Sequence, residues 1–145
     1  MGGFKFKLES VLKHREQSQL EAQEKFLKER EAYDSIVREV ETTREKIIDA
    51  HRMIDEGGLE YAHHYQAMEQ YRIRLERELK EKENEATKQR NVMKIAKDKL
   101  FEATKELKAI EKLREKKFEE YKKEIQSNES KFLDELVSIR SNRVN

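Results

Sequence analysis

One pair of residues, Gly57-Gly58, is the only place inside this chain where a helix is expected to stop. The other two glycines are Gly2 and Gly3, and the sequence contains no proline. Glycine costs a helix interior about 1 kcal/mol relative to alanine and readily adopts the positive φ of a turn. We therefore predict one helix over about 5–54, a turn over about 55–59 with its hinge at Gly57 and Gly58, and a second helix over about 60–142.

The composition favours long exposed helices over a compact globule. Charged residues make up 43% of the 145 residues, hydrophobic residues only 35%, and the mean hydropathy is −1.10. A globular domain of this length has a larger apolar share to bury. Disorder is the competing interpretation of so polar a chain, and the periodicity of the apolar residues argues against it.

Positions that step alternately by four and three residues form an apolar seam along each predicted helix, as in a coiled coil. In the first helix the seam is Leu8, Leu12, Arg15, Gln19, Ala22, Phe26, Glu29, Tyr33, Ile36, Val40, Thr43, Ile47, Ala50 and Ile54. In the second helix it is Tyr61, Tyr65, Met68, Arg72, Leu75, Leu79, Lys82, Ala86, Gln89, Met93, Ala96, Leu100, Ala103, Leu107 and Ile110.

Folding the chain at the glycines brings the two seams together. The expected register pairs Ile54 with Tyr61, Val40 with Leu75, and Leu8 with Leu107. The predicted fold class is therefore all-α. Two long helices form one antiparallel coiled-coil hairpin over residues 1–145, and helix 2 overhangs at the C-terminus.

The apolar pattern changes phase beyond Ile110, because the step from Leu107 to Phe118 is a stutter in the heptad repeat. We expect residues about 110–145 to overhang as an unpaired helix of about 50 Å. This helix cannot bury its own apolar stripe, which predicts docking on another protein, with self-association as the alternative. The stripe comprises Phe118, Tyr121, Ile125, Phe132, Leu133, Leu136, Val137 and Ile139.

Several kinds of chemistry are not expected. The net charge of +1 with interspersed signs disfavours nucleic-acid binding, and no apolar run exceeds two residues, so we expect no membrane insertion. The four histidines (His14, His51, His63 and His64) lack metal-site spacing, and no phosphate-binding glycine loop occurs. A two-helix hairpin also lacks a concave site. We expect no enzymatic activity, no metal and no cofactor.

Both ends of the chain carry short motifs of a known family. The first motif is Phe4-Lys5-Phe6-Lys7-Leu8-Glu9-Ser10-Val11-Leu12, followed by Arg15-Glu16, and the second is Lys131-Phe132-Leu133-Asp134-Glu135-Leu136, followed by Arg140. Together they resemble the opening and the C-terminal segment of the FliJ family of flagellar export proteins. The two-helix layout and the absence of cysteine fit the same family.

The resemblance implies a non-enzymatic cytoplasmic component of the flagellar type III export apparatus, held at the inner face of the membrane through its partners. Members of the family resemble the two coiled-coil helices of the gamma subunit of rotary ATP synthases. They bind the hexameric export ATPase at the centre of its ring and contact the membrane export gate protein. Some of them also bind export chaperones.

Two sets of candidate contact residues follow from the resemblance. The expected contacts to the ATPase ring are Phe4, Phe6, Leu8, Phe118, Phe132, Asp134, Glu135, Leu136 and Arg140. The expected contacts to the export gate are Tyr65, Met68, Arg72, Leu75 and Leu79.

Other functions fit the same features. One is the equivalent stalk protein of a virulence type III secretion system. A rotor subunit of a vacuolar-type ATPase fits less well, since such chains carry additional residues in the middle. A coiled-coil scaffold or dimerisation module without an ATPase partner would form a dimer through the overhang.

Overall fold

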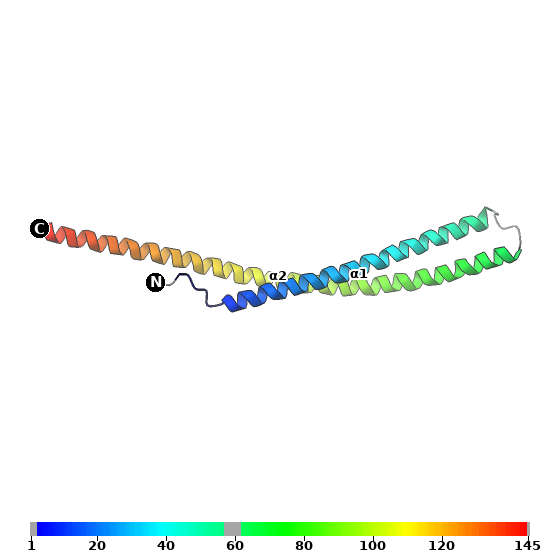
Figure 1. Ribbon diagram of the computed structural model, residues 1–145, viewed down its shortest axis with the longest axis horizontal. Helices are drawn as coiled ribbons and strands as arrows, with labels where there is room; N and C mark the ends of the chain where they lie inside the picture. Colours follow the sequence, from blue (N-terminus) through cyan, green and yellow to red (C-terminus); the bar gives the residue numbers. More distant parts are fainter. Residues whose placement is uncertain (1–2, 57–61, 145) are drawn as a thin grey trace. The chain divides into compact units, whose positions relative to one another are not determined.

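The computed structural model describes residues 3–56 and 62–144, which form two long helices, α1 (Glu9–Asp55) and α2 (Ala62–Val144) (Figure 1). The all-α prediction is confirmed. The predicted hinge residues, Gly57 and Gly58, lie outside the described residues, as does Tyr61 of the second seam.

Helix α1 begins later than the expected position near residue 5. Its first backbone bond runs from the Leu12 N–H to the Leu8 carbonyl at 2.9 Å, and the Glu9 N–H donates to the Phe6 carbonyl at 3.2 Å. Glu9 lies in the first turn and Arg52 in the last turn, where their charges complement the helix dipole. Residues 4–8 therefore precede the helix and adopt a separate conformation.

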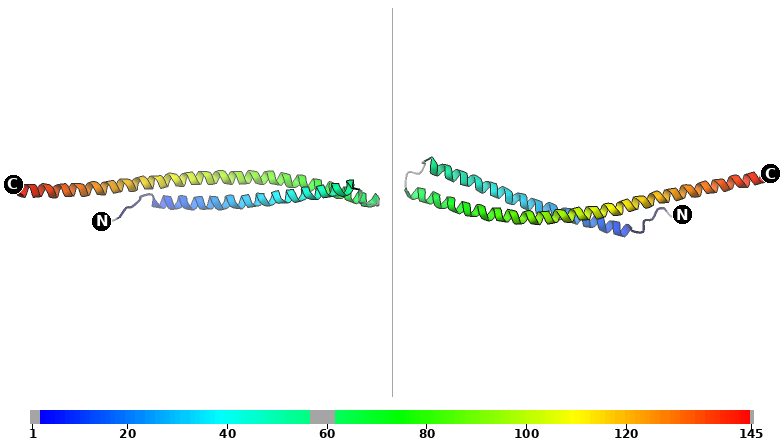
Figure 2. Two further views of the ribbon diagram at one scale, coloured as in Figure 1. Left: turned by 90° about the horizontal axis from the view of Figure 1, so that it is seen from above. Right: turned by 180° about the vertical axis from the view of Figure 1, so that it is seen from behind.

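The chain divides into two compact units, residues 21–101 and residues 1–20 with 102–145. In the first unit α1 and α2 run side by side, as the views in Figures 1 and 2 agree. Their direction is antiparallel, since Glu29 bonds Gln89 whereas His51 lies 3.8 Å from Glu76.

The core of the 21–101 unit consists of side chains from the predicted seams. Its buried apolar residues are Val40, Ala50, Leu75 and Ala96, and Thr43 is buried among them. The Thr43 hydroxyl donates to the Glu39 carbonyl of its own helix at 2.9 Å, which satisfies the buried group. The seam prediction is therefore confirmed for the buried positions of this unit.

The predicted register of the two seams is wrong by about one heptad. It places Glu39 beside Glu76, but the Glu39 carboxylate instead accepts a hydrogen bond from Lys82 Nζ at 2.8 Å. In the unit that contains the chain ends, Glu9 pairs with Arg114 at 3.3 Å, although its expected neighbour was Glu106. A slip of one heptad keeps every seam residue on the seam, so hydrophobic periodicity alone cannot distinguish the two registers.

Candidate protein-binding surface

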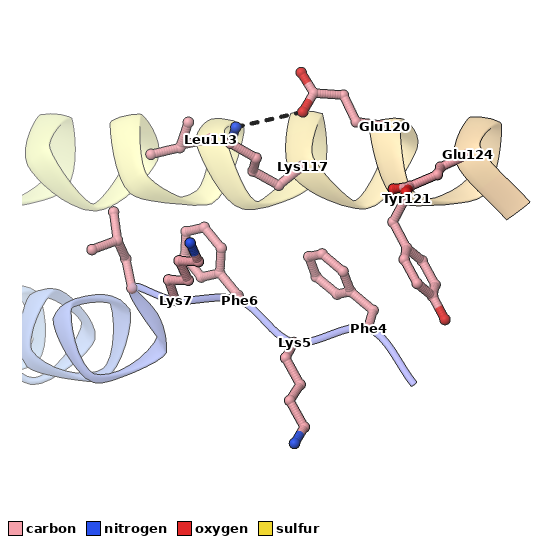
Figure 3. Close-up of a pocket in the computed structure, with 10 residues that line it drawn as sticks. Phe4, Lys5, Phe6, Lys7, Leu113, Lys117, Glu120, Tyr121 and Glu124 are labelled. Atoms are coloured by element: carbon pink, nitrogen blue, oxygen red, sulfur yellow. Dashed lines mark ion pairs between the residues drawn. The ribbon is translucent and has the colours of Figure 1, made fainter. Parts of the chain in front are cut away.

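Residues 4–8, which we call the N-terminal strap, pack along α2 in the unit that contains the chain ends. Phe4 and Phe6 are half-buried, whereas Lys5 and Lys7 between them are exposed. This alternation is the period of two typical of extended chain, in which every second side chain lies on the same side. Figure 3 shows both phenyl rings directed toward α2 and Lys5 directed away from it.

Phe4 makes the ring contacts that hold the strap on α2. Its ring lies edge-on to Phe118, with 5.2 Å between centroids, and tilted against Tyr121 at 5.6 Å. The Arg114 guanidinium carbon lies 5.8 Å from the centre of the Phe4 ring, which permits a cation–π interaction. The Arg114 side chain also bonds to Glu9 and so connects the strap, the start of α1 and α2.

An open hollow of about 540 Å³ lies between the strap and the segment 113–124 of α2 (Figure 3). On its rim, Lys117 Nζ lies 3.5 Å from a carboxylate oxygen of Glu120. The strap is therefore incompletely packed on the helix that it covers. The hollow is lined by Phe4, Lys5, Phe6, Lys7, Leu8, Leu113, Lys117, Glu120, Tyr121 and Glu124.

The strap shortens the part of α2 that lacks a neighbour. The sequence predicted an unpaired helix from about residue 110, but Leu113 is half-buried and Arg114, Phe118 and Tyr121 are engaged by Glu9 and Phe4. These contacts extend to Tyr121, so the overhang does not begin at about residue 110, and the prediction of where it starts is wrong.

Beyond the strap, α2 carries an exposed apolar surface that we call the distal stripe. Phe132 and Val137 are 61% and 67% exposed. The charged candidates Asp134, Glu135 and Arg140 are also exposed. The distal stripe consists of Ile125, Phe132, Leu133, Leu136, Val137 and Ile139.

The five gate candidates occupy different environments in the 21–101 unit. Tyr65 is 48% exposed, Met68 and Leu79 are half-buried, and Leu75 is a core residue with 4% exposure. Arg72 donates to Glu69 at 2.7 Å and to Glu76 at 2.8 Å. The hydrogen bond to Glu69 is the largest cause that holds the pKa of Arg72 above its ordinary value. The Leu75 side chain is thus buried in the core between α1 and α2 and does not lie on the surface where a partner would bind.

Among the described residues, no group of three or more His, Cys, Asp or Glu side chains is arranged to hold a metal ion. Within the same residues, neither helix has a stretch long and apolar enough to cross a membrane. The described surface has exposed apolar side chains on both helices, among them Leu20 and Ile48 on α1 and Phe101 and Phe132 on α2.

The sequence analysis missed the packing of the strap on α2, in particular the contact of Leu113 and Lys117 with the strap hollow and the pairing of Arg114 with Glu9. A signal was present in the alternation Phe4-Lys5-Phe6-Lys7, which has the period of an extended segment rather than of a helix.

A family model described as the flagellar FliJ protein matches residues 4–145, which covers both the strap and the distal stripe. No curated protein and no solved structure matches the chain significantly.

Proposed function

Since the chain belongs to the FliJ family, and is thereby a component of the flagellar protein-export apparatus, we propose that it is a non-enzymatic stalk. In this proposal it binds the hexameric export ATPase through α2 and couples the ATPase to the membrane export gate. The observation that carries the proposal is the distal stripe, an apolar surface on a single helix.

Burial of the distal stripe could offset the lower estimates of the free-energy cost of association. Complete burial of a Leu, Val, Ile or Phe side chain contributes about 1.5–3 kcal/mol, so six partly exposed side chains could contribute about 6 kcal/mol in total. This contribution is comparable to the lower estimates of about 4–15 kcal/mol for the entropy lost on association. Charged contacts around the stripe would then supply specificity and orientation.

Within the distal segment, we propose Phe132, Leu136 and the flanking charges Asp134, Glu135 and Arg140 as contacts to the ATPase ring. All five are exposed in the structure. The other ring candidates are placed differently, because Phe4 is packed on Phe118, and Phe6 and Leu8 line the strap hollow. Leu8 and Phe118 are still 38% and 37% exposed, and movement of the strap would expose more of all four residues.

For the export gate, we propose a surface on the first turns of α2. Tyr65 is the most exposed candidate, and Arg72 presents a cation fixed between two carboxylates. Met68 supplies an adaptable apolar side chain, whereas Leu75 and Leu79 would act by holding this part of α2 against α1. Binding to both partners couples the ATPase ring to the export gate only if the affinity for one partner depends on the state of the other partner.

This assignment implies a cytoplasmic protein that reaches the membrane through its partners. Export chaperones are further candidate partners under the same proposal. No nucleic acid and no cofactor is required by it.

The proposal is tested by binding and stimulation of the cognate export ATPase. The informative variant is Phe132→Asp/Leu136→Asp, which places two charges in the distal stripe, and the matched control is Ser130→Asp, a residue outside the stripe on the same helix. We expect the double variant to lose ATPase binding and stimulation while its circular dichroism stays helical, and the control to retain both.

Light scattering on the same samples separates the second candidate function. A coiled-coil scaffold would use the distal stripe to form a homodimer, and the double variant would then convert a dimer to a monomer without any effect on ATP hydrolysis. Full ATPase binding by Phe132→Asp/Leu136→Asp would contradict the assignment of the distal stripe to the ring.

A further inference from the structure

We propose that the ATPase-binding surface of α2 continues beneath the N-terminal strap, and that residues 4–8 cover this part until the ATPase displaces them. The strap would thus be an autoinhibitory contact built into the chain. This inference rests on the proposed function, because it names a regulation of the same binding surface.

The covered and exposed parts of α2 form one continuous face. From Phe118 the apolar positions advance by three, four, seven, four and three residues, and steps of this kind keep side chains on one side of a helix. Phe4 contacts the first two members, of which Tyr121 is half-buried and Phe118 keeps 37% of its surface exposed, and the remaining members are exposed, from 38% at Ile125 to 61% at Phe132. The face consists of Phe118, Tyr121, Ile125, Phe132, Leu136 and Ile139.

The strap is held on α2 through its two aromatic side chains. Phe4 contacts the rings of Phe118 and Tyr121 and lies near Arg114, and Phe6 is half-buried and directed toward α2 (Figure 3). The bond from the Glu9 N–H to the Phe6 carbonyl joins the strap only to the start of α1. Because the hollow of about 540 Å³ leaves the strap partly unsupported, it has the properties of a segment that opens locally at low cost.

The surface under the strap is aromatic, with charges of both signs around it, because Glu120 and Glu124 line the hollow and Lys122 lies 3.5 Å from Glu119. Removal of Phe4 would expose Phe118 and Tyr121 further as aromatic contacts. Two cations lie around them, Arg114 beside the position of the Phe4 ring and Lys122 with its Nζ 4.7 Å from the centre of the Phe118 ring. The occupant that we assign is the same export ATPase that binds the distal stripe, since the two surfaces are continuous.

A reversible covalent lock tests the inference directly. The chain has no cysteine, so a Phe4→Cys/Tyr121→Cys variant would contain one pair of thiols, at positions whose aromatic rings lie 5.6 Å apart in the unaltered chain. A thiol-reactive cross-linker with a cleavable disulfide in its spacer can join the two thiols without the close Cβ approach that a direct disulfide needs. We expect the oxidised, cross-linked protein to bind the ATPase at least about tenfold more weakly than the same protein after reduction, because affinity scales with the fraction of competent molecules. The two single-cysteine variants should not respond to reductant.

A second variant tests the opposite displacement. Phe4→Asp removes the ring contacts of the strap, and we expect it to bind the ATPase several-fold more tightly than the unaltered chain, up to the ratio of closed to open molecules. Equal affinity of the oxidised and reduced double-cysteine protein would overturn the inference. Weaker binding by Phe4→Asp would overturn it as well, because Phe4 would then be a direct contact.

The outcomes also distinguish this inference from the proposed function. If the unaltered chain binds the ATPase and Phe132→Asp/Leu136→Asp does not, the proposed function stands whatever the lock shows. If the unaltered chain fails to bind the ATPase at all, the proposed function is wrong and the inference is refuted with it.

Discussion

Leu75 provides a test of whether α1 and α2 pack as described, because a core side chain and an exposed contact to the export gate respond differently to substitution. The resemblance to the FliJ family made Leu75 a candidate for the second role. Its side chain is 4% exposed within the 21–101 unit. Leu→Ala changes in protein cores cost about 2–5 kcal/mol, and the cost is lower where neighbours can close the cavity. A two-helix interface allows such closure, so Leu75→Ala is expected to lower the free energy of unfolding by about 2–3 kcal/mol.

Urea unfolding followed by far-ultraviolet circular dichroism measures this change, provided that the slope with denaturant stays constant. The matched control is Ile73→Ala on the same helix, where the side chain is 48% exposed and a loss of only about 0.5 kcal/mol is expected. If Leu75→Ala and Ile73→Ala are equally mild, Leu75 does not lie in a core and the packing of the two helices is refuted.

The same variants separate stability from gate binding. Tyr65 is exposed, so Tyr65→Ala should leave the unfolding free energy within about 0.5 kcal/mol of the unaltered chain while weakening binding to the isolated export gate protein. Leu75→Ala should change gate affinity only under conditions where part of the protein is unfolded. A large loss of gate affinity in fully folded Leu75→Ala would show that Leu75 itself reaches the gate.

Three further predictions concern polar groups between the helices. Glu39→Lys should lower the melting temperature, and Glu39→Lys/Lys82→Glu should restore part of it at low salt but less at high salt, because the ion pair joins α1 to α2. The hydrogen bond to Glu39 holds the pKa of Lys82 in the folded protein above the ordinary 10.5. The ion pair therefore stabilises the fold fully below pH 10.5, and this stabilisation is lost as the pH rises through the higher pKa of the folded state. Thermal melts of Lys82→Met should lack this alkaline decline. Thr43→Val should raise the unfolding free energy by up to about 1 kcal/mol in urea titrations, since the hydroxyl bonds only to its own helix, and a loss of stability would show that the hydroxyl is needed.

The seam itself could be predicted from the sequence because helix packing depends directly on hydrophobic periodicity. Val40, Ala50, Leu75 and Ala96 are all seam positions, and all are buried. Even the polar seam residue Gln89 behaves as such a position should, since its amide lies between the helices and donates to the Glu29 carboxylate at 2.6 Å. A polar group in the seam favours one register over others at some cost in stability.

The register could not be predicted from the same information. Two seams with a seven-residue repeat remain matched after a slip of one heptad, so the choice depends on interhelical charges and on the geometry of the turn. The pairs Glu39–Lys82 and Arg44–Glu83 satisfy opposite charges in the observed register. These pairs are individually weak, so the sequence pattern alone does not indicate which charged residues pair between the helices.

The strap shows a different limit of sequence analysis. An apolar stripe on a helix indicates that something covers it, but the pattern does not say whether the cover is a partner or the chain itself. Here Phe4 packs on Phe118 and Tyr121 and covers them in part, while Phe132 on the same face is 61% exposed. The alternating segment Phe4-Lys5-Phe6-Lys7 is too short to bury its rings alone, and α2 is too long to be covered by α1 alone. The strap therefore partly buries its rings against α2, and α2 gains cover for Phe118 and Tyr121 from the strap. Under the proposed function, a partner that binds the exposed part of the face would gain these further contacts by competing with the strap.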